Sequence, residues 1–126
     1  MIIDDISKDI ETSNTTLSLK TNLFKGFMPD NPDNCVVVLD TGGAAPDKDI
    51  PTGSPTFQIL VRDKNYKTGH DLMQTIVNLF HRRMNETIGT TYYYSIFLLG
   101  EAGNIGRDDK GRDEFSVNFI CHIRRW

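Results

Sequence analysis

The sequence predicts an α+β fold in which a mostly antiparallel sheet of about five strands is flanked by an N-terminal helix and one long amphipathic helix. Five segments have the period-two alternation or the β-branched density of strands. One segment, about residues 68–86, instead repeats apolar residues every three or four positions, as a helix does. The length of 126 residues suits one compact unit, so residues 1–126 are expected to form a single domain.

The first expected element is an amphipathic helix within residues 1–20. Ile2, Ile3, Ile6 and Ile10 recur there at near-helical spacing between polar residues. Such a stripe predicts one apolar face that packs on the sheet.

Two strands are expected next, at residues 22–29 and 35–41, on either side of the turn-rich segment DNPDN. Because the intervening turn is short, these strands are predicted to form a hairpin. The following residues, 42–55, contain the run GGAA and three prolines, which disfavour regular structure. This segment is therefore expected to be a connector.

The third strand, residues 56–63, alternates apolar and polar side chains. The helix at about 68–86 follows, with Thr68 and Asp71 expected at its beginning and with Arg82 and Arg83 expected in its last turn. The cap and the closing charges agree with the direction of the helix dipole.

The last two strands are expected at residues 92–100 and 114–125. The first is apolar on both faces and is predicted to be central, and the second alternates strictly, which predicts one covered and one accessible face. Between them lies EAGNIGRDDKGRD, which is longer than a hairpin requires. Excess loop length of this kind commonly carries function.

Composition narrows the class of protein. A net charge of −3 gives no general preference for nucleic acid or anionic membranes. Cys35 and Cys121 are too far apart in sequence for a CxxC pair and favour a reducing compartment, and the histidines show no metal-ligand spacing. The N-terminus lacks the pattern of a secretory signal, and no segment is long and apolar enough to span a membrane. No catalytic, cofactor-binding or metal-binding residues are assigned.

The stretch CVVVLDTGG resembles the way in which retroviral-type aspartic proteases present a catalytic carboxylate, here Asp40. The later stretch IGRDD resembles the Gly-Arg-Asp element of that family, and two copies of a chain would have to contribute one carboxylate each. However, IGRDD leads into a turn and a strand where the family has a helix, and the helix at 68–86 lies where the family has strands and a flap. A dimeric aspartic protease therefore stays an alternative.

Residues 36–125 resemble the minor capsid and tail terminator proteins of long-tailed, siphovirus-like bacteriophages. Four motifs, which follow one another in the order of that family, carry the resemblance: TGGAAP, SPTFQILVRD, HDLMQTIVNLFHRR and IGRDDKGRDEFSVNFICHIRR. Because a chance match must reproduce the helix as well as both strands, the order is stronger evidence than any single motif.

The resemblance implies a structural virion protein and not an enzyme. Its subunits are expected to form a ring, usually a hexamer, that caps the tail tube and joins the tail to the head. The implied partners are further copies of the chain, the major tail tube protein, the head completion or connector protein, and viral DNA that passes through the ring without sequence-specific binding. The implied location is the neck of the virion, after assembly in the host cytoplasm. Another phage neck or head completion protein, or a small cytoplasmic binding module, stays an alternative.

Candidate interface residues are charged or aromatic side chains near strand ends. The long loop contributes alternating charges that suit a complementary neighbour, although a solvated loop would have the same composition. Arg62 and Tyr66 lie at the end of the third strand, and Trp126 follows the last strand. The candidates are Arg62, Tyr66, Arg107, Asp108, Asp109, Lys110, Arg112 and Trp126.

Overall fold

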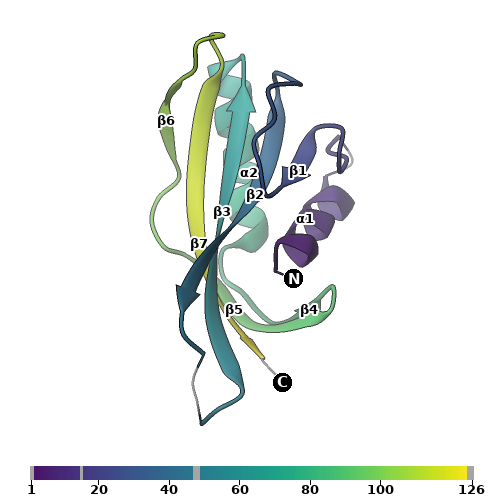
Figure 1. Cartoon of the computed structure of the whole chain (residues 1–126), viewed down its shortest axis with the longest axis vertical. Coiled ribbons are helices and arrows are strands. Elements are labelled where there is room, and N and C mark those ends of the chain that lie inside the picture. The colour runs from purple at the N-terminus through teal and green to yellow at the C-terminus, as the bar shows by residue number, and fades with distance from the viewer. Residues whose placement is uncertain (1, 15, 47–48, 125–126) are drawn as a thin grey trace.

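The computed structural model describes residues 2–14, 16–46 and 49–124. Its elements are α1 (Ile2–Ser13), β1 (Leu23–Lys25), β2 (Cys35–Ala44), β3 (Thr52–Asp63), α2 (Tyr66–Phe80), β4 (Arg83–Ile88), β5 (Thr91–Leu98), β6 (Gly103–Arg107) and β7 (Asp113–Arg124). The strands of the described chain form one 7-stranded sheet in the order β1-β2-β3-β7-β5-β4, with β6 paired to β7 (Figure 1). β1 and β2 are parallel, and the other neighbours are antiparallel.

The predicted α+β fold with about five mostly antiparallel strands is wrong, because the protein is mostly β and has a mixed, 7-stranded sheet. β4 and β6 account for the additional strands, and neither has an alternating apolar pattern. Each becomes a strand because β5 or β7 offers it an antiparallel ladder of backbone hydrogen bonds. Tertiary pairing therefore decides these two elements against their local sequence.

The expected hairpin at the beginning of the sheet is also wrong. Leu23, in β1, lies opposite Val36, and Lys25 lies opposite Val38, so the two strands run in the same direction. Residues 26–34 carry the chain back along the sheet before β2 begins. The loop that the sequence predicts as a simple turn thus reaches the end of the sheet.

The expected connector at 42–55 is largely strand. β2 continues to Ala44 and β3 begins at Thr52, so the two form an arm that extends away from the helices (Figure 1). Pro55 is accommodated because the ladder between β3 and β7 is interrupted there, between the pairs Gly53–Ile123 and Thr56–Ile120.

The long helix is confirmed in position but is shorter than predicted. It begins after Asn65, whose side chain accepts a hydrogen bond from the Thr68 backbone N–H at 3.1 Å, so Asn65 and not Thr68 is the N-cap. It ends at Phe80, because Arg82 takes a φ of 68° and donates its backbone N–H to Ile96 of β5. The chain then turns into β4. The N-terminal helix likewise ends at Ser13, within the expected range of 1–20.

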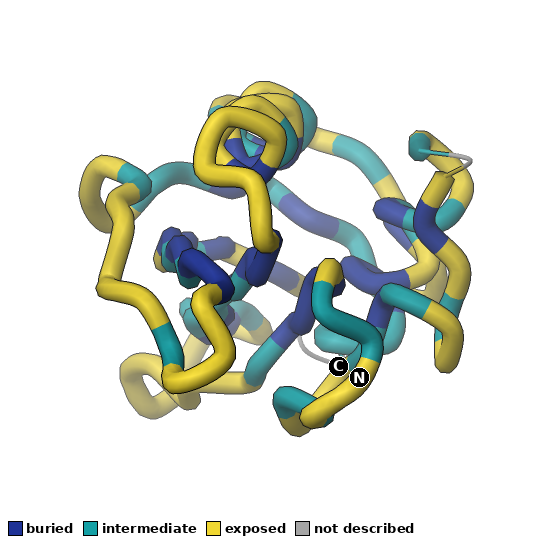
Figure 2. Tube along the Cα trace, turned by 90° about the horizontal axis from the view of Figure 1, so that it is seen from above, coloured by how far each residue is buried: buried dark blue, intermediate teal, exposed yellow. Residues whose placement is uncertain are grey.

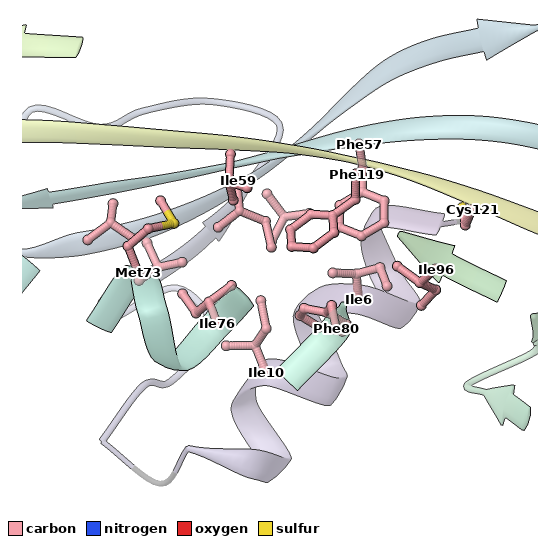
Figure 3. Close-up of a cluster of buried hydrophobic side chains, with 14 of the residues drawn as sticks. Ile6, Ile10, Phe57, Ile59, Met73, Ile76, Phe80, Ile96, Phe119 and Cys121 are labelled. Atoms are coloured by element: carbon pink, nitrogen blue, oxygen red, sulfur yellow. The ribbon is translucent and has the colours of Figure 1, made fainter. Parts of the chain in front are cut away.

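The core lies between one face of the sheet and both helices (Figures 2 and 3). Phe57 of β3 and Phe119 of β7 stack at 5.1 Å between ring centroids, and Phe80 of α2 meets both edge-on. Ile6 and Ile10 of α1 join the same cluster. The strict alternation predicted for the last strand is confirmed, since alternate residues of β7 face this core.

A buried carboxylate fixes α1 on the sheet. Asp5 accepts hydrogen bonds from the Thr90 backbone N–H at 3.2 Å and from the Tyr93 hydroxyl at 3.3 Å. Burial, with the Asp5 charge as the next contribution, raises the pKa of Tyr93, so the hydroxyl stays protonated and donates. The first helix is thereby tied to the turn between β4 and β5.

Candidate functional site

Two loops meet at the end of the sheet where β2 begins, β3 ends and β7 begins. One is the loop 30–34 between β1 and β2, and the other is the turn 108–112 between β6 and β7. We call their charged residues the tip cluster, which consists of Asp30, Asp33, Arg62, Asp108, Lys110 and Arg112.

Arg112 joins the two loops. Its Nε donates to the Asp108 carboxylate at 2.7 Å, and its Nη1 donates to the backbone carbonyl of Asp30 and to the Asp33 carboxylate. The side chain is only 4% exposed. Asp108 also accepts the backbone N–H of Arg112 at 2.9 Å, which closes the turn on itself. The fork of the guanidinium thus fixes the turn and the facing loop in one arrangement.

Arg62, which is 3% exposed, holds the same loop from the sheet side. Its guanidinium donates to the backbone carbonyls of Pro32 at 2.6 Å, Asp33 at 3.1 Å and Asp30 at 3.3 Å. These carbonyls have no strand partner, and the arginine satisfies them. Arg62 and Arg112 therefore form bonds within the chain, and their role is to position the loops.

Three predicted interface residues remain accessible at the tip. Asp109 is exposed and has no ion-pair partner among the described residues. Lys110 is exposed and contacts the Asp30 carboxylate at 2.6 Å, and Arg107 is exposed and contacts the Asp113 carboxylate at 3.2 Å. The turn held by Arg112 therefore presents Asp109 and Lys110 outward, beside Arg107 at the end of β6.

The tip carboxylates are set to remain ionised. The hydrogen bond from Lys110 lowers the pKa of Asp30, and the hydrogen bond from Lys64 lowers the pKa of Asp33. Partial burial acts to raise the pKa of Asp108, but the backbone amide and guanidinium of Arg112 outweigh it, so this pKa is lowered too. The cluster consequently keeps its charges at neutral pH.

The remaining candidates lie elsewhere. Tyr66 is the first residue of α2, is exposed, and contacts Phe115 edge-on at 5.2 Å. Trp126 lies outside the described residues. The sequence analysis missed Asp30 and Asp33 because their segment had the composition of an ordinary turn. The segment DNPDN is rich in aspartate, and the later loop contains basic residues. This opposite charge was the feature of the sequence that could have indicated a contact between the two loops.

Sequence reasoning also missed an apolar hollow beside β1. It has a volume of about 420 Å³, and its lining residues are Leu19, Lys20, Leu23, Phe24, Lys25 and Phe27. Phe27 is 59% exposed, which is unusual for so large an apolar side chain. In the sequence, the two phenylalanines of the run FKGF, Phe24 and Phe27, were the feature that could have indicated this hollow.

Asp40 does not have the surroundings that aspartic chemistry requires within one chain. Its carboxylate accepts the backbone N–H of Gly42 at 2.9 Å, at the bulge between β2 and β3. It lies opposite Phe57, five positions along β3 from Arg62, which corresponds to roughly 16 Å at the rise of a strand. Asp108, from the second protease-like motif, lies at the tip beyond Arg62, so the two carboxylates do not meet within the chain.

Neither a metal centre nor a membrane helix is found in the part of the chain that the structure describes. Its histidine, cysteine and acidic residues form no group of three or more that could hold a metal ion. The helices among the described residues do not have the length and hydropathy needed to cross a membrane.

A sheet that fixes charged loops at one end and exposes large apolar residues at its edges is suited to contacts with other proteins. The chain belongs to the bacteriophage tail terminator protein family, whose model matches residues 5–125. The resemblance to this family is thereby confirmed, and the protein is a structural protein of a phage tail, located in the virion.

Comparison with solved structures shows the same fold in a phage-like particle. A chain of the structure described as "Virion of native gene transfer agent (GTA) particle" superposes with a TM-score of 0.64 at 13% sequence identity. The match covers 82% of this chain and 79% of that chain. No curated protein matches the sequence.

Proposed function

We propose that the protein forms a ring, of six subunits by family resemblance, that caps the head-proximal end of the tail tube and joins the tail to the head. The observation that carries this proposal is the family match across residues 5–125. Its partners are further copies of itself, the major tail tube protein and the head completion or connector protein. The ring is assembled in the host cytoplasm before it becomes part of the neck of the virion.

The proposed mechanism is physical. The ring presents to the tube a surface that tube subunits recognise, and on its other side it presents a different surface, so polymerisation stops. Identical subunits close into such a ring through contacts between two unlike surfaces. Viral DNA passes through the lumen without sequence-specific binding, and the net charge of −3 agrees with weak attraction to phosphate.

In this proposal the tip contacts a neighbour. Arg107, at the end of β6, and Asp109 and Lys110 provide the charges, while Arg112 holds the turn that carries Asp109 and Lys110 and Arg62 holds the facing loop. Fixed charges select a complementary partner at little cost in ordering, because the loops are already in place.

Deletion of the gene from the phage tests the proposal. We expect tails of variable length that are not joined to capsids in electron micrographs, and recovery of normal particles when the wild-type protein is supplied. Tails of normal length attached to capsids in the absence of the protein would overturn it.

Charge reversal at the tip tests the role of these loops. Complementation with Asp109→Lys plus Lys110→Glu is expected to lower the yield of joined particles at least tenfold, whereas Lys8→Glu, on the exposed surface of α1, leaves it unchanged. Equal yields for the two variants would remove the tip from the interface without affecting the proposed ring.

The aspartic protease alternative is tested at Asp40. Asparagine retains the oxygen that accepts the Gly42 N–H, so Asp40→Asn is expected to support normal assembly in the same complementation experiment. A loss of particle maturation together with a loss of peptide cleavage would favour the protease instead.

A further inference from the structure

Two apolar surfaces of different shape lie at opposite edges of the sheet. The first is the hollow beside β1, which is lined mainly by Leu19, Leu23, Phe24 and Phe27. The second is Ile105, which projects from β6 and is 57% exposed. Figure 1 shows β1 and β6 on opposite sides of the molecule and in the same half of it.

The outer edges of β1 and β6 are poorly suited to pairing with another strand. In β1, the N–H of Leu23 donates to Ser18 and its carbonyl accepts from Lys20, so these groups are occupied within the chain. In β6, the register shifts between Asn104 and Gly106, and this irregularity places Ile105 at a bulge. Bulges and occupied backbone groups prevent extension of a sheet, so a partner here is expected to bind by side-chain packing.

Among the described residues, the charges without an ion-pair partner around the two surfaces have opposite signs, since Arg107 and Lys110 near β6 are paired with Asp113 and Asp30. Lys20 and Lys25 lie at the hollow; Lys25 is paired with the Asp4 carboxylate, whereas Lys20 has no ion-pair partner among the described residues. Glu101 precedes β6 and Asp109 follows it, and neither has an ion-pair partner within the described ranges. A contact that brings the β6 edge to the hollow therefore places acidic groups near basic ones.

The two surfaces are complementary to each other but not to themselves. Because the hollow and Ile105 lie on opposite sides of the molecule, one twofold interface holds only one of them, so it would bring a hollow to a hollow, or Ile105 to Ile105, with like charges together. A head-to-tail contact instead brings Ile105 of one copy into the hollow of the next and leaves the corresponding surfaces free to continue around a ring.

We propose that the β6 edge of each subunit, with Ile105 at its centre, packs into the β1 hollow of the neighbouring copy. This inference rests on the proposed ring and specifies which surfaces close it. Phe27 lies at the hollow, and Lys20 provides the charge that faces the acids around β6.

Cross-linking between cysteines tests the contact directly. The double variant Phe27→Cys plus Ile105→Cys is treated with a short thiol-to-thiol cross-linker on assembled tails. The native residues Cys35 and Cys121 are buried, with exposures of 3% and 0%, and they leave the background low. We expect a ladder of linked species that ends at the closed ring, and no linked species with either single variant. Dimers formed by a single variant would show a twofold contact and overturn the inference.

Substitution gives a second test that does not depend on cross-linking. Ile105→Arg is expected to reduce the fraction of protein in rings at least tenfold. This fraction is measured by native mass spectrometry, or by the density of the ring in electron micrographs of tails. Leu99→Arg is the matched control, because Leu99 is equally exposed at 55% but lies outside β6. Both side chains are on the surface, so the variants should retain the wild-type circular dichroism spectrum.

The outcomes separate the contact from the ring itself. If wild-type rings are present on tails but the double variant does not cross-link and Ile105→Arg still forms rings, the contact is wrong and the proposed function stands. If the wild type forms no ring in solution or on tails, the proposed function fails and the contact fails with it.

Discussion

The two ends of the long strands are held by different physical means. At the tip, the buried guanidinium groups of Arg62 and Arg112 tie loops from distant parts of the chain together. At the other end, the arm of β2 and β3 depends on two glycines with positive φ and on a hydroxyl pair between Thr41 and Thr56 at 2.7 Å. Every residue of β2 from Asp40 to Ala44 is exposed, whereas Cys35 to Val38 are buried.

This difference indicates where the structure tolerates change. The tip loops contact the body through buried charged hydrogen bonds, so their disruption is expected to spread into the sheet. The arm has few contacts outside its own ladder and its edge on β7, so its disruption is expected to remain local. The tip can therefore present charges in a fixed arrangement, while the arm opens at a lower cost in free energy.

The largest effect is expected from Arg62→Met. Loss of the guanidinium leaves the backbone carbonyls of Pro32 and Asp33 without this donor, while the Asp30 carbonyl keeps its bond from Arg112. The free energy of unfolding should fall by about 2–3 kcal/mol. Denaturant unfolding measures this change. The control Lys64→Met removes an exposed contact to Asp33 and should change stability by less than about 0.5 kcal/mol. Similar losses for the two variants would contradict the difference between buried and exposed bonds at the tip.

The next effect is expected in the arm, from Gly43→Ala. A Cβ atom there would lie 2.4 Å from the Ser54 carbonyl oxygen, and the φ of 118° is already unfavourable for alanine. We expect a loss of about 2 kcal/mol or more in the local opening free energy of the arm, measured by amide hydrogen exchange.

Gly42→Ala is the matched control for the arm. Gly42 also has a positive φ, of 84°, but a Cβ atom there would meet nothing within 4 Å. Its cost should therefore be limited to backbone strain, about 1 kcal/mol. If Gly42→Ala opened the arm as much as Gly43→Ala does, the close approach of the two strands would not be the reason for glycine at 43.

Acidification is expected to loosen the tip. The pKa values of Asp30, Asp33 and Asp108 are lowered from the ordinary value of an aspartate. These carboxylates therefore stabilise the folded state above pH 4, and that contribution is lost as the pH falls through their folded pKa values. Amide hydrogen exchange is measured at pH 6 and at pH 3 and corrected for intrinsic rates. Protection of residues 108–112 should be lower at pH 3 than at pH 6. Unchanged protection there would contradict the assigned cause.

The smallest effect is expected from Thr41→Val. The variant removes one exposed hydroxyl from its pair with Thr56 and retains the β-branched shape. The loss in the opening free energy of the arm should be about 0.5 kcal/mol, since a solvated hydrogen bond exchanges readily for water. Amide exchange of the arm measures it, and a loss as large as that of Gly43→Ala would show that the hydroxyl pair holds the arm.

Several features of the fold and the site followed from the sequence. The apolar stripe that includes Met73, Ile76 and Phe80 predicted α2, and the alternation of residues 114–125 predicted β7. The charged loop was predicted as a candidate interface, which stays a prediction; Asp109 and Lys110 are exposed there. These features were predictable because periodicity and charge act over a few neighbouring residues.

The roles of Arg62 and Arg112 could not be predicted in the same way. From the sequence, both arginines were expected to be charged residues on the surface. Both are buried because the loop 30–34 provides carbonyl and carboxylate groups that accept their hydrogen bonds. The parallel direction of β1 relative to β2 could not be predicted from the sequence either, because it depends on how the loop 30–34 is held at the tip.

The sequence by itself determined the two helices, most of the long strands and the family, since these depend on local periodicity and on the order of motifs. Only the tertiary structure decided the strands β4 and β6, the arm, and the opposite placement of Ile105 and the β1 hollow. The physical reason is that strand pairing and burial join residues far apart in the chain, and a partner strand or a buried charge can override what each segment would do alone.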